Sequence, residues 1–315
     1  MDGAARWYPM RARSPSRRPC ATLPAVTARS EVPTSFRSSS VRPGPLALIR
    51  LGVSETLSRR RLIAYLVRAD LKKSGADTLL GNVWWVVDPL LQMLVYWLLV
   101  SVILKRGAGT PDYPLFIFAA ILPWKWFEIT VREGGSSVVF REKLIKQIYF
   151  PKLVLPFAAT VSGIVNFAFG LIPLVGMMLL LYPERITPWL LLIPVVAFVQ
   201  LVFSLAVATA LSALNVFYRD IGNLSRHLLR FWFYLSPALY GMDQVASLSG
   251  RNQAADLWFA LNPWTYLLSA YRDLIYYGQA PDWGALLIVL LASIVLLFLC
   301  ILLFKRLEPS FAKVL

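Results

Sequence analysis

Long apolar runs alternate with short charged segments from residue 84 to the end of the chain. A transmembrane helix needs about 20 mostly apolar residues. We place six spans near 84–104, 114–131, 153–181, 189–213, 226–245 and 284–304. The fifth is the weakest, because only 231–242 is free of charged residues and a run this short also fits a re-entrant segment. The pattern predicts an all-α membrane protein.

Basic residues are distributed unevenly over the segments between these spans. With six spans and the N-terminus inside, the inner segments hold 17 Lys and Arg residues and the outer segments hold 5. Lys and Arg are enriched in cytoplasmic loops. Removing the fifth span would place the basic residues after the last span outside. The charge pattern therefore favours six spans with both termini in the cytoplasm.

The segment before the first span, LSRRRLIAYLVRADLKK at 57–73, predicts a basic amphipathic helix. Its apolar positions recur at helical spacing, and they are Leu62, Tyr65, Leu66 and Ala69. Its basic side chains can reach phosphate groups, and they are Arg59, Arg60, Arg68, Lys72 and Lys73. A helix of this kind lies in the membrane interface rather than across the membrane.

A second amphipathic segment, FREKLIKQIYFPK at 140–152, joins the second and third spans. On a helix, its apolar side holds Phe140, Leu144, Ile145 and Ile148, and its polar side holds Glu142, Lys143, Lys146 and Gln147. A helix lying flat at the membrane can dock against a soluble partner. The next inner loop, 215–223, carries Arg219 and Asp220 on the same side of the membrane. We expect the two loops together to receive force from an attached motor.

The longest outer segment, 246–283, is too apolar for a free loop and too interrupted for another span. Proline disfavours helix at the residue before it. The segment therefore predicts two short helices broken at Asn262 and Pro263. We expect them to dip into the outer leaflet as re-entrant helices.

Composition places the chain in the membrane class. Hydrophobic residues make up 57% and charged residues 16%, against roughly 25% charged residues in soluble domains. The formal charge of +15 could indicate nucleic-acid binding, but the charges flank apolar spans, so topology accounts for them and we expect no nucleic-acid partner.

Residues 1–45 are rich in Arg, Ser and Pro and predict a disordered basic extension, although this composition also resembles a transit peptide. Residues 46–315 form the membrane domain.

Motifs of catalysis and metal binding are missing from the sequence. It has no phosphate-binding GxxxxGK[ST] loop, no HExxH and no GxSxG. Its cysteines, Cys20 and Cys300, lie far apart, and its single histidine is His227. We therefore expect no catalytic residue, no metal site and no cofactor on this chain.

Charged and aromatic residues within the spans are the remaining candidates for function. Intramembrane charges are functional hypotheses by default. Asp88 can cap the first span, and Lys125 and Glu128 share a helix face, so they can pair with each other. The aromatic residues fit either an interfacial belt or a path for sugar rings, and the path candidates are Trp84, Tyr96, Trp97, Phe127 and Tyr234.

Four stretches resemble the permease subunit of polysaccharide-export ABC transporters, a family that exports O-antigens, teichoic acids and cell-wall galactans. They are LGNVWWVVDPLLQMLVYWLLV (80–100), FREKLIKQIYFPKLVLP (140–156), ALNVFYRDIGNL (213–224) and LNPWTYLLSAYRDLIYYG (261–278). The resemblance runs from about residue 55 to the C-terminus. It implies a homodimeric pore in the bacterial plasma membrane, above a separate ATPase dimer that holds ATP and Mg.

The resemblance also implies roles for particular residues. The coupling helix at 138–150 and the following inner loop would contact the ATPase through Phe140, Arg141, Glu142, Lys143, Lys146, Tyr149, Arg219 and Asp220. The helix at 57–73 would be a gate where Arg59, Arg60 and Arg61 meet the pyrophosphate of a lipid-linked polysaccharide. Residues 248–280 would form the outer gate, with Asn262, Trp264, Tyr266 and Arg272.

Two other functions stay open from the sequence. One keeps the ABC permease and changes the cargo to a drug or a small lipid. The other is a membrane-embedded transferase acting on a polyprenyl lipid. A transferase needs a base or metal-binding carboxylates at one membrane face, and the sequence offers no convincing cluster of them.

Overall fold

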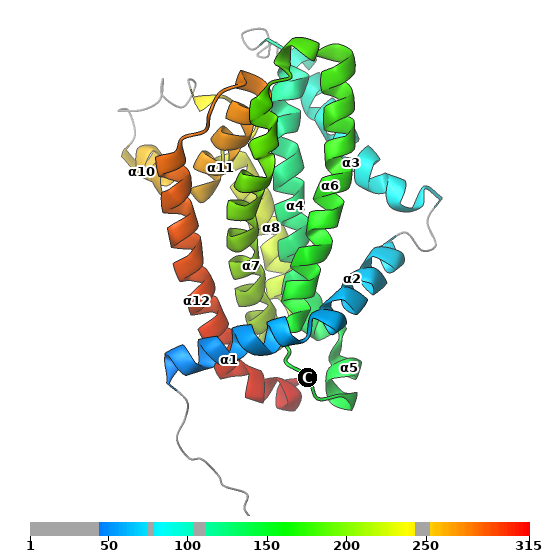
Figure 1. The fold of residues 1–315 in the computed structure, drawn as a ribbon, viewed down its shortest axis with the longest axis vertical. Helices are drawn as coiled ribbons and strands as arrows, with labels where there is room; N and C mark the ends of the chain where they lie inside the picture. Colours follow the sequence, from blue (N-terminus) through cyan, green and yellow to red (C-terminus); the bar gives the residue numbers. More distant parts are fainter. Residues whose placement is uncertain (1–43, 75–78, 104–110, 243–252) are drawn as a thin grey trace, which may run out of the picture. The chain divides into compact units, whose positions relative to one another are not determined.

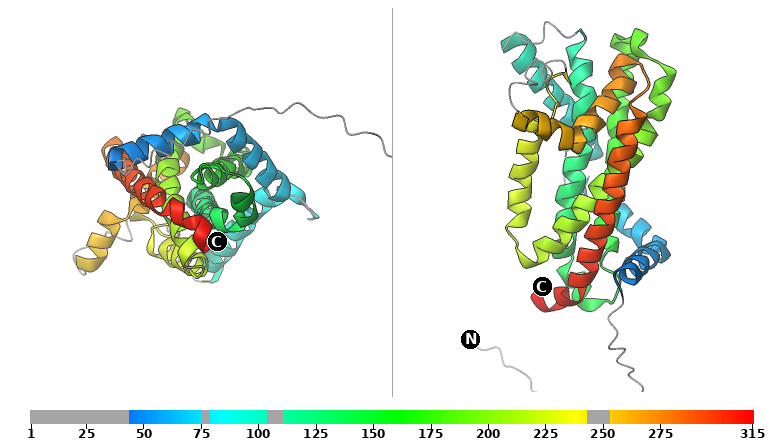
Figure 2. Two further views of the ribbon diagram at one scale, coloured as in Figure 1. Left: turned by 90° about the horizontal axis from the view of Figure 1, so that it is seen from below. Right: turned by 90° about the vertical axis from the view of Figure 1, so that its left-hand side faces the viewer.

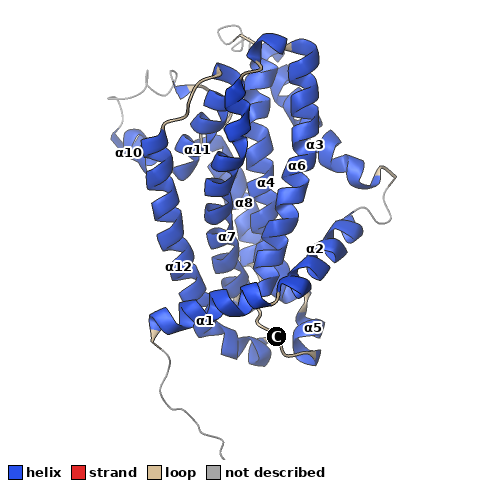
Figure 3. Ribbon diagram, in the orientation of Figure 1, coloured by secondary structure: helices blue, strands red, loops and turns tan. Residues whose placement is uncertain are grey.

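The computed structural model of the chain describes residues 44–74, 79–103, 111–242 and 253–315. Within these ranges the chain is helical and contains no strand (Figure 3). The extension predicted to be disordered lies outside the described residues, apart from its last two positions. The second of these, Pro45, already begins a helix.

The helices are numbered in the order of the chain, and Figure 1 labels the α-helices. Their bounds are α1 Pro45–Ser58, α2 Arg60–Ser74, η1 Gly81–Val83, α3 Trp84–Trp97, η2 Leu98–Ile103, α4 Tyr113–Phe140, α5 Glu142–Gln147, α6 Val154–Leu181, η4 Pro183–Arg185, η5 Pro188–Leu192, α7 Ile193–Phe217, α8 Ile221–Leu235, α10 Gln253–Leu261, α11 Pro263–Arg272, η6 Asp273–Tyr277 and α12 Trp283–Val314.

Five helical stretches among the described residues are long and apolar enough to cross a membrane. They are Gly81–Ile103, Tyr113–Phe140, Val154–Leu181, Pro188–Phe217 and Trp283–Phe311. These five correspond to the first four predicted spans and the last one. The chain is a multi-pass membrane protein.

The predicted fifth span, 226–245, is represented by α8, which starts five residues earlier and ends at Leu235. Its 15 residues extend about 22 Å, short of a hydrocarbon core of about 30 Å. Although it is short, α8 leads from the end of α7 toward the start of α11 (Figure 2). There the Trp232 indole donates a hydrogen bond to Asn262. The six-span topology therefore stays a prediction.

Helix α4 lies at the centre of the bundle. It packs against α3, α6 and α7, and α7 packs in turn against α12 (Figure 1). The stretch Leu115–Ile121 of α4 is almost entirely buried. Rings from α4, α7, α8 and α11 form one aromatic core, and they are Trp124, Phe127, Phe203, Trp232 and Trp264. This core joins the long spans to the short helices.

Small residues let the long helices approach closely, as is common where transmembrane helices cross. A Cβ added to Gly163 of α6 would lie 2.5 Å from Thr130 Oγ1 and 3.0 Å from the Trp126 ring, both on α4. A Cβ on Gly176, about three and a half turns further along α6, would meet nothing within 4 Å. The α4–α6 crossing thus depends on glycine at 163 and not at 176.

The interface helix differs from its prediction in two respects. It begins at Arg60, after a break at Arg59, and a second helix, α1, precedes it. The face packed against α6 carries Ile63, Leu66 and Val67. The predicted apolar face was therefore partly wrong, since Tyr65 is 70% exposed. Both faces of α2 carry apolar residues, so spacing alone did not select the buried one.

The break predicted at Asn262–Pro263 is confirmed. Helix α10 ends at Leu261, and Pro263 opens α11. The Asn262 side chain accepts a hydrogen bond from the Trp264 backbone N–H and so caps α11. An Asn cap followed by proline at the first helical position is a favourable helix start. The start of the predicted outer gate, residues 248–252, lies outside the described residues.

Candidate functional site

The segment around α5 projects from one end of the bundle, beside α1, α2 and the last turns of α12 (Figure 2). The predicted coupling helix at 138–150 is in fact divided, because Phe140 ends α4 and α5 covers Glu142–Gln147. Arg141, between the two helices, donates to Asp70 of α2 at 2.5 Å. This contact fixes the start of α5 against the interface helix.

Two further polar contacts hold α5 itself. Lys146 Nζ donates to Glu142 Oε1 at 2.5 Å and to the Leu315 carbonyl oxygen at 2.7 Å. The hydrogen bond from Lys146 lowers the pKa of the Glu142 carboxyl below its usual 4.5, and the positive charge of Arg219 acts in the same direction. Lys146 thus connects α5 to Leu315, directly after α12.

Two aromatic side chains at this end are largely uncovered within the described part of the chain. Phe140 is 82% exposed and Tyr149 is 99% exposed. Lys143, Arg219 and Asp220 are exposed as well. The apolar side predicted for this segment is therefore divided, because Ile145 is buried against the bundle while the aromatic residues at the ends of the segment point outward. We call the exposed set Phe140, Lys143, Tyr149, Arg219 and Asp220 the docking surface.

The three arginines of the predicted pyrophosphate site follow one another at the junction of α1 and α2. Arg59, Arg60 and Arg61 are all exposed. Together with Ser58 and Leu62 they line an open pocket of 490 Å³. Adjacent guanidinium groups present many N–H donors, which suit phosphate oxygens.

Polar side chains form a row along α3, within a stretch that is long and apolar enough to cross a membrane. Asp88, Gln92 and Tyr96 follow one another at four-residue spacing, so they share one helix face. Lys125 Nζ of α4 lies 2.8 Å from Asp88 Oδ2. The Tyr96 hydroxyl lies 3.3 Å from that of Tyr234 on α8. The expected Lys125–Glu128 pair and the capping role of Asp88 are corrected here, since Asp88 pairs with Lys125.

The five aromatic residues of the predicted polysaccharide path occupy different environments. Trp84, Tyr96 and Tyr234 lie at least partly on the surface of the chain, and Trp97 packs against the core. Phe127 is completely buried in the aromatic core between Phe203 and Trp264. The structure does not place Phe127 on any open surface, because α7, α8 and α11 cover its ring.

The residues of the predicted outer gate are mainly packing residues in this structure. Arg272 is buried and donates to the carbonyl oxygens of Pro237 at 2.5 Å, Ala238 at 2.6 Å and Tyr240 at 3.2 Å. Its guanidinium also lies 3.8 Å from the centre of the Phe116 ring. Arg272 therefore holds the turn after α8 against α4 and α11.

The other three outer residues support the same region. The Asn262 amide donates to Ser236 Oγ at 2.9 Å, and its oxygen accepts from the Trp232 indole at 2.9 Å. Trp264 is buried. The Tyr266 hydroxyl donates to the Ala260 carbonyl oxygen at 2.9 Å. These contacts fix the angle between α8, α10 and α11.

Several charged residues with structural contacts were missed by the sequence reasoning. Near the docking surface they are Glu55, Asp70, Lys152, Lys305 and Glu308. At the opposite end, Arg185 pairs with Asp112 at 2.8 Å, and this bond raises the pKa of Arg185. Apart from Lys305 and Glu308, which are three residues apart on α12, these partners lie 71 to 250 residues apart in the chain. Their positions in charged segments between spans were the available signal, but the pairing depends on tertiary structure.

The fold and these surfaces define a polytopic helical membrane protein with exposed aromatic and charged side chains at one end. The family model described as ABC-2 type transporter matches residues 61–276. The chain belongs to this family, and it is therefore a transport permease of the ABC class.

Curated relatives extend the similarity over most of the chain. An O-antigen export system permease protein RfbA from Myxococcus xanthus is 35% identical over 266 residues, which cover 84% of this chain and 99% of that protein. Two proteins of the same name from Klebsiella pneumoniae are 26% and 25% identical, and each alignment covers 81% of this chain and 95% of the relative.

Proposed function

We propose that the protein moves a lipid-linked polysaccharide from the inner to the outer side of the bacterial plasma membrane. It forms the pore as a homodimer, with both termini in the cytoplasm, and a separate ATPase dimer binds ATP and Mg. The observation that carries the proposal is the similarity to the Myxococcus xanthus O-antigen export permease over 99% of that protein's length. An O-antigen export permease is thus matched over almost its whole length.

The docking surface supports the ATPase partnership. Exposed aromatic residues such as Phe140 and Tyr149 are the residue types that anchor protein interfaces. Lys143 and Arg219 add charge around them, which favours specificity and fast association. The bonds of Arg141 and Lys146 hold the surface in a fixed position, so a movement of the ATPase would be transmitted to the membrane helices.

The polar row on α3 supports a second copy of the chain. Asp88 is largely exposed in the protomer, although it lies in a stretch that can cross a membrane. Polar residues at this depth face other protein or a water-filled cavity rather than lipid. A homodimer that joins the two α3 and α8 faces would enclose such a cavity. The Tyr96 and Tyr234 hydroxyls would then face the hydroxyl groups of the polymer, with Trp84 and Trp97 near the path.

The arginines between α1 and α2 support an anionic lipid carrier. Arg59, Arg60 and Arg61 are exposed and adjacent. They lie on the helices that we assign to the membrane interface, where the pyrophosphate of a polyprenyl carrier would be found. The outer residues Asn262, Trp264, Tyr266 and Arg272 would hold the exit side in position.

A charge exchange in α5 tests the ATPase partnership. The double variant Glu142→Lys/Lys146→Glu keeps an oppositely charged pair on the helix but reverses the charges offered to a partner. We expect it to insert into the membrane at the wild-type level and to lose co-purification with the ATPase. Glu184→Lys, an exposed charge at the opposite end of the bundle, is the matched control. Wild-type co-purification of the double variant would contradict the assignment.

Deletion of the gene in its own organism tests the cargo. Export of a lipid-linked polysaccharide predicts that the polymer disappears from the cell surface and accumulates, still on its lipid, inside the cell. A permease for a drug or small lipid predicts unchanged surface polymer. A transferase on a polyprenyl lipid predicts loss of the polymer without accumulation of its finished, lipid-linked form.

A further inference from the structure

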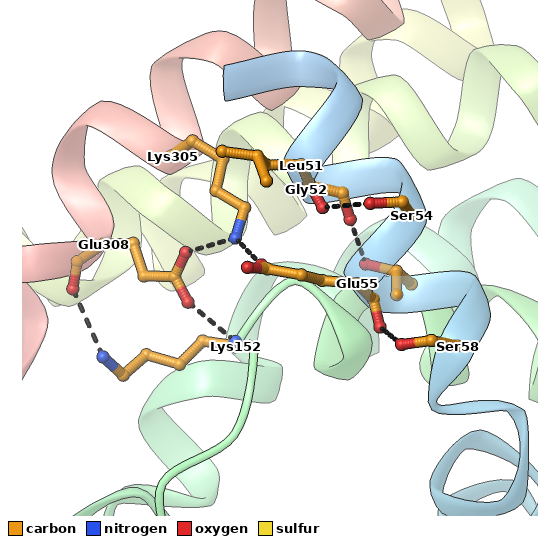
Figure 4. Close-up of polar contacts among 9 residues, drawn as sticks. Leu51, Gly52, Ser54, Glu55, Ser58, Lys152, Lys305 and Glu308 are labelled. Carbon is orange, nitrogen blue, oxygen red and sulfur yellow. Dashed lines mark hydrogen bonds and ion pairs between the residues drawn. The ribbon is translucent and has the colours of Figure 1, made fainter. Parts of the chain in front are cut away.

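A continuous chain of charged residues leads from the segment after α5 to α12 and on to α1 (Figure 4). The backbone N–H of Lys152 donates to Glu308 Oε1 at 2.8 Å, and Lys152 Nζ donates to the Glu308 carbonyl oxygen at 3.3 Å. Lys305 Nζ lies 3.0 Å from Glu308 Oε2 and 2.7 Å from Glu55 Oε2. Four residues on three separate elements are thus connected. The step between Lys152 and Glu308 joins the backbone of each residue to the side chain of the other, and the remaining steps are ion pairs between side chains.

The ion pair in the middle of this series of charged residues is difficult to break, because it is buried. The side chain of Lys305 is 9% exposed and that of Glu308 is 14% exposed. Removing one partner of a buried ion pair leaves the other charge without compensation, which is strongly unfavourable. Lys305 and Glu308 therefore tend to stay in contact when the helix that carries them moves, whereas Glu55, whose side chain is 44% exposed, is the more open end of the series.

Close packing at Gly52 fixes α1 on α12 at the same place. A Cβ added to Gly52 would lie 2.9 Å from Lys305 Cε and 3.4 Å from Ile301 Cγ2. The backbone of α1 thus rests directly on the aliphatic part of Lys305, one turn before Glu55. The ion pair and the helix contact position α1 together.

A separate contact connects the α5 segment to α2. Arg141, immediately before α5, is bonded to Asp70 of α2 at 2.5 Å. The α5 segment is therefore connected to the interface helices by two independent routes. Arg141 leads to α2, and Lys152 leads through Glu308 and Lys305 to α1.

We propose that Lys152, Glu308, Lys305 and Glu55 form a relay that makes α1 move with the docking surface when the ATPase changes its nucleotide state. The four are positioning residues, and none of them is assigned a contact with substrate. This inference rests on the proposed function, because it requires an ATPase at the docking surface. It adds a defined route from that surface to α1, distinct from the route to α2.

Hydrogen–deuterium exchange on the full complex of the chain with its ATPase tests the relay. Exchange is followed in peptides that cover α1, α2 and α5, without nucleotide and with ATP and vanadate. In the wild type we expect nucleotide to change exchange in all three helices. Lys305→Met keeps the aliphatic stem and removes the charge. In this variant we expect the responses of α5 and α2 to persist and the response of α1 to be lost.

Lys313→Met is the matched control, because Lys313 is an exposed lysine of the same helix, and it should respond like the wild type. If Lys305→Met reduces the yield of the complex, Glu308→Gln makes the same test with an acceptor for the Lys152 N–H retained. A purely structural role would weaken all three responses together, whereas the relay predicts loss at α1 alone.

Two results would overturn the relay while leaving the proposed function in place. One is a wild-type response at α1 in both variants. The other is a wild-type complex in which α5 responds to nucleotide and α1 does not. A wild-type chain that binds no ATPase, or whose α5 does not respond to nucleotide, would overturn the proposed function and the relay together.

Discussion

The buried Arg272 gives the sharpest test of how the outer end of the bundle is held. Its guanidinium donates to the carbonyl oxygens of Pro237 and Ala238 at 2.5 and 2.6 Å and stacks on Phe116. We consider Arg272→Met, which removes the guanidinium and leaves an apolar side chain of similar length. The change leaves the carbonyls of the turn after α8 without this donor.

The expected loss of stability follows from these contacts. A buried polar group left without a partner costs about 1–3 kcal/mol, so the two short bonds together represent about 2–6 kcal/mol. Removing a buried cation recovers part of this, because its desolvation no longer opposes folding. We expect a net loss of about 3 kcal/mol. Arg272→Lys should lose roughly half as much, since one ammonium cannot reproduce the planar fork that reaches both carbonyls.

Equilibrium unfolding of the purified chain in mixed SDS micelles measures these losses. Arg306→Met, which alters an exposed arginine of α12, serves as the control. The order wild type, Lys variant, Met variant in decreasing stability would support the reasoning. It would be refuted if Arg272→Met were as stable as Arg306→Met, because the carbonyl contacts would then contribute nothing measurable.

Three further predictions follow from contacts at other places in the chain. Gly163→Leu should destabilise the α4–α6 crossing by about 3 kcal/mol through overpacking, whereas Gly176→Leu, in open space, should change stability little in the same SDS unfolding assay. Asp88→Asn and Lys125→Met should be non-additive by about 1 kcal/mol in a double-mutant cycle, and strict additivity would show that the ion pair is energetically silent. The pKa of Glu142 is lowered, so the Glu142–Lys146 pair that holds α5 should be intact at neutral pH. The pair should be lost only as the pH falls below 4.5 and through the folded-state pKa of Glu142. Glu142→Gln should therefore speed amide exchange in α5 at pH 7, and unchanged exchange would contradict this.

The helical class and most element positions could be predicted from hydropathy, because bilayer length imposes a strong pattern. The break at Asn262–Pro263 was predictable for a local reason, since proline restricts the residue before it. By contrast, α8 was predicted too long. The pattern shows how far apolar residues extend, and it does not show that the backbone turns after Leu235, where Ser236 and Arg272 make tertiary contacts.

Most partners of the charged residues could not be predicted, because they lie far apart in sequence. Lys125 was expected to pair with Glu128 on its own helix, but Asp88 of the neighbouring α3 lies within 2.8 Å. Phe127 was expected on a sugar path from its residue type, and its burial depends on how α7, α8 and α11 pack around it. Residue type and spacing identified candidates, whereas helix packing decided which of them reach a surface.

Transport in inverted membrane vesicles tests the central claim most directly. The vesicles contain the chain and its ATPase, with lipid-linked polysaccharide in the outward-facing cytoplasmic leaflet. ATP should move the polymer into the lumen, where it becomes protected from periodate added outside, and the Glu142→Lys/Lys146→Glu variant should give no protection. Polymer that stays fully open to periodate while the wild-type complex hydrolyses ATP would contradict the account.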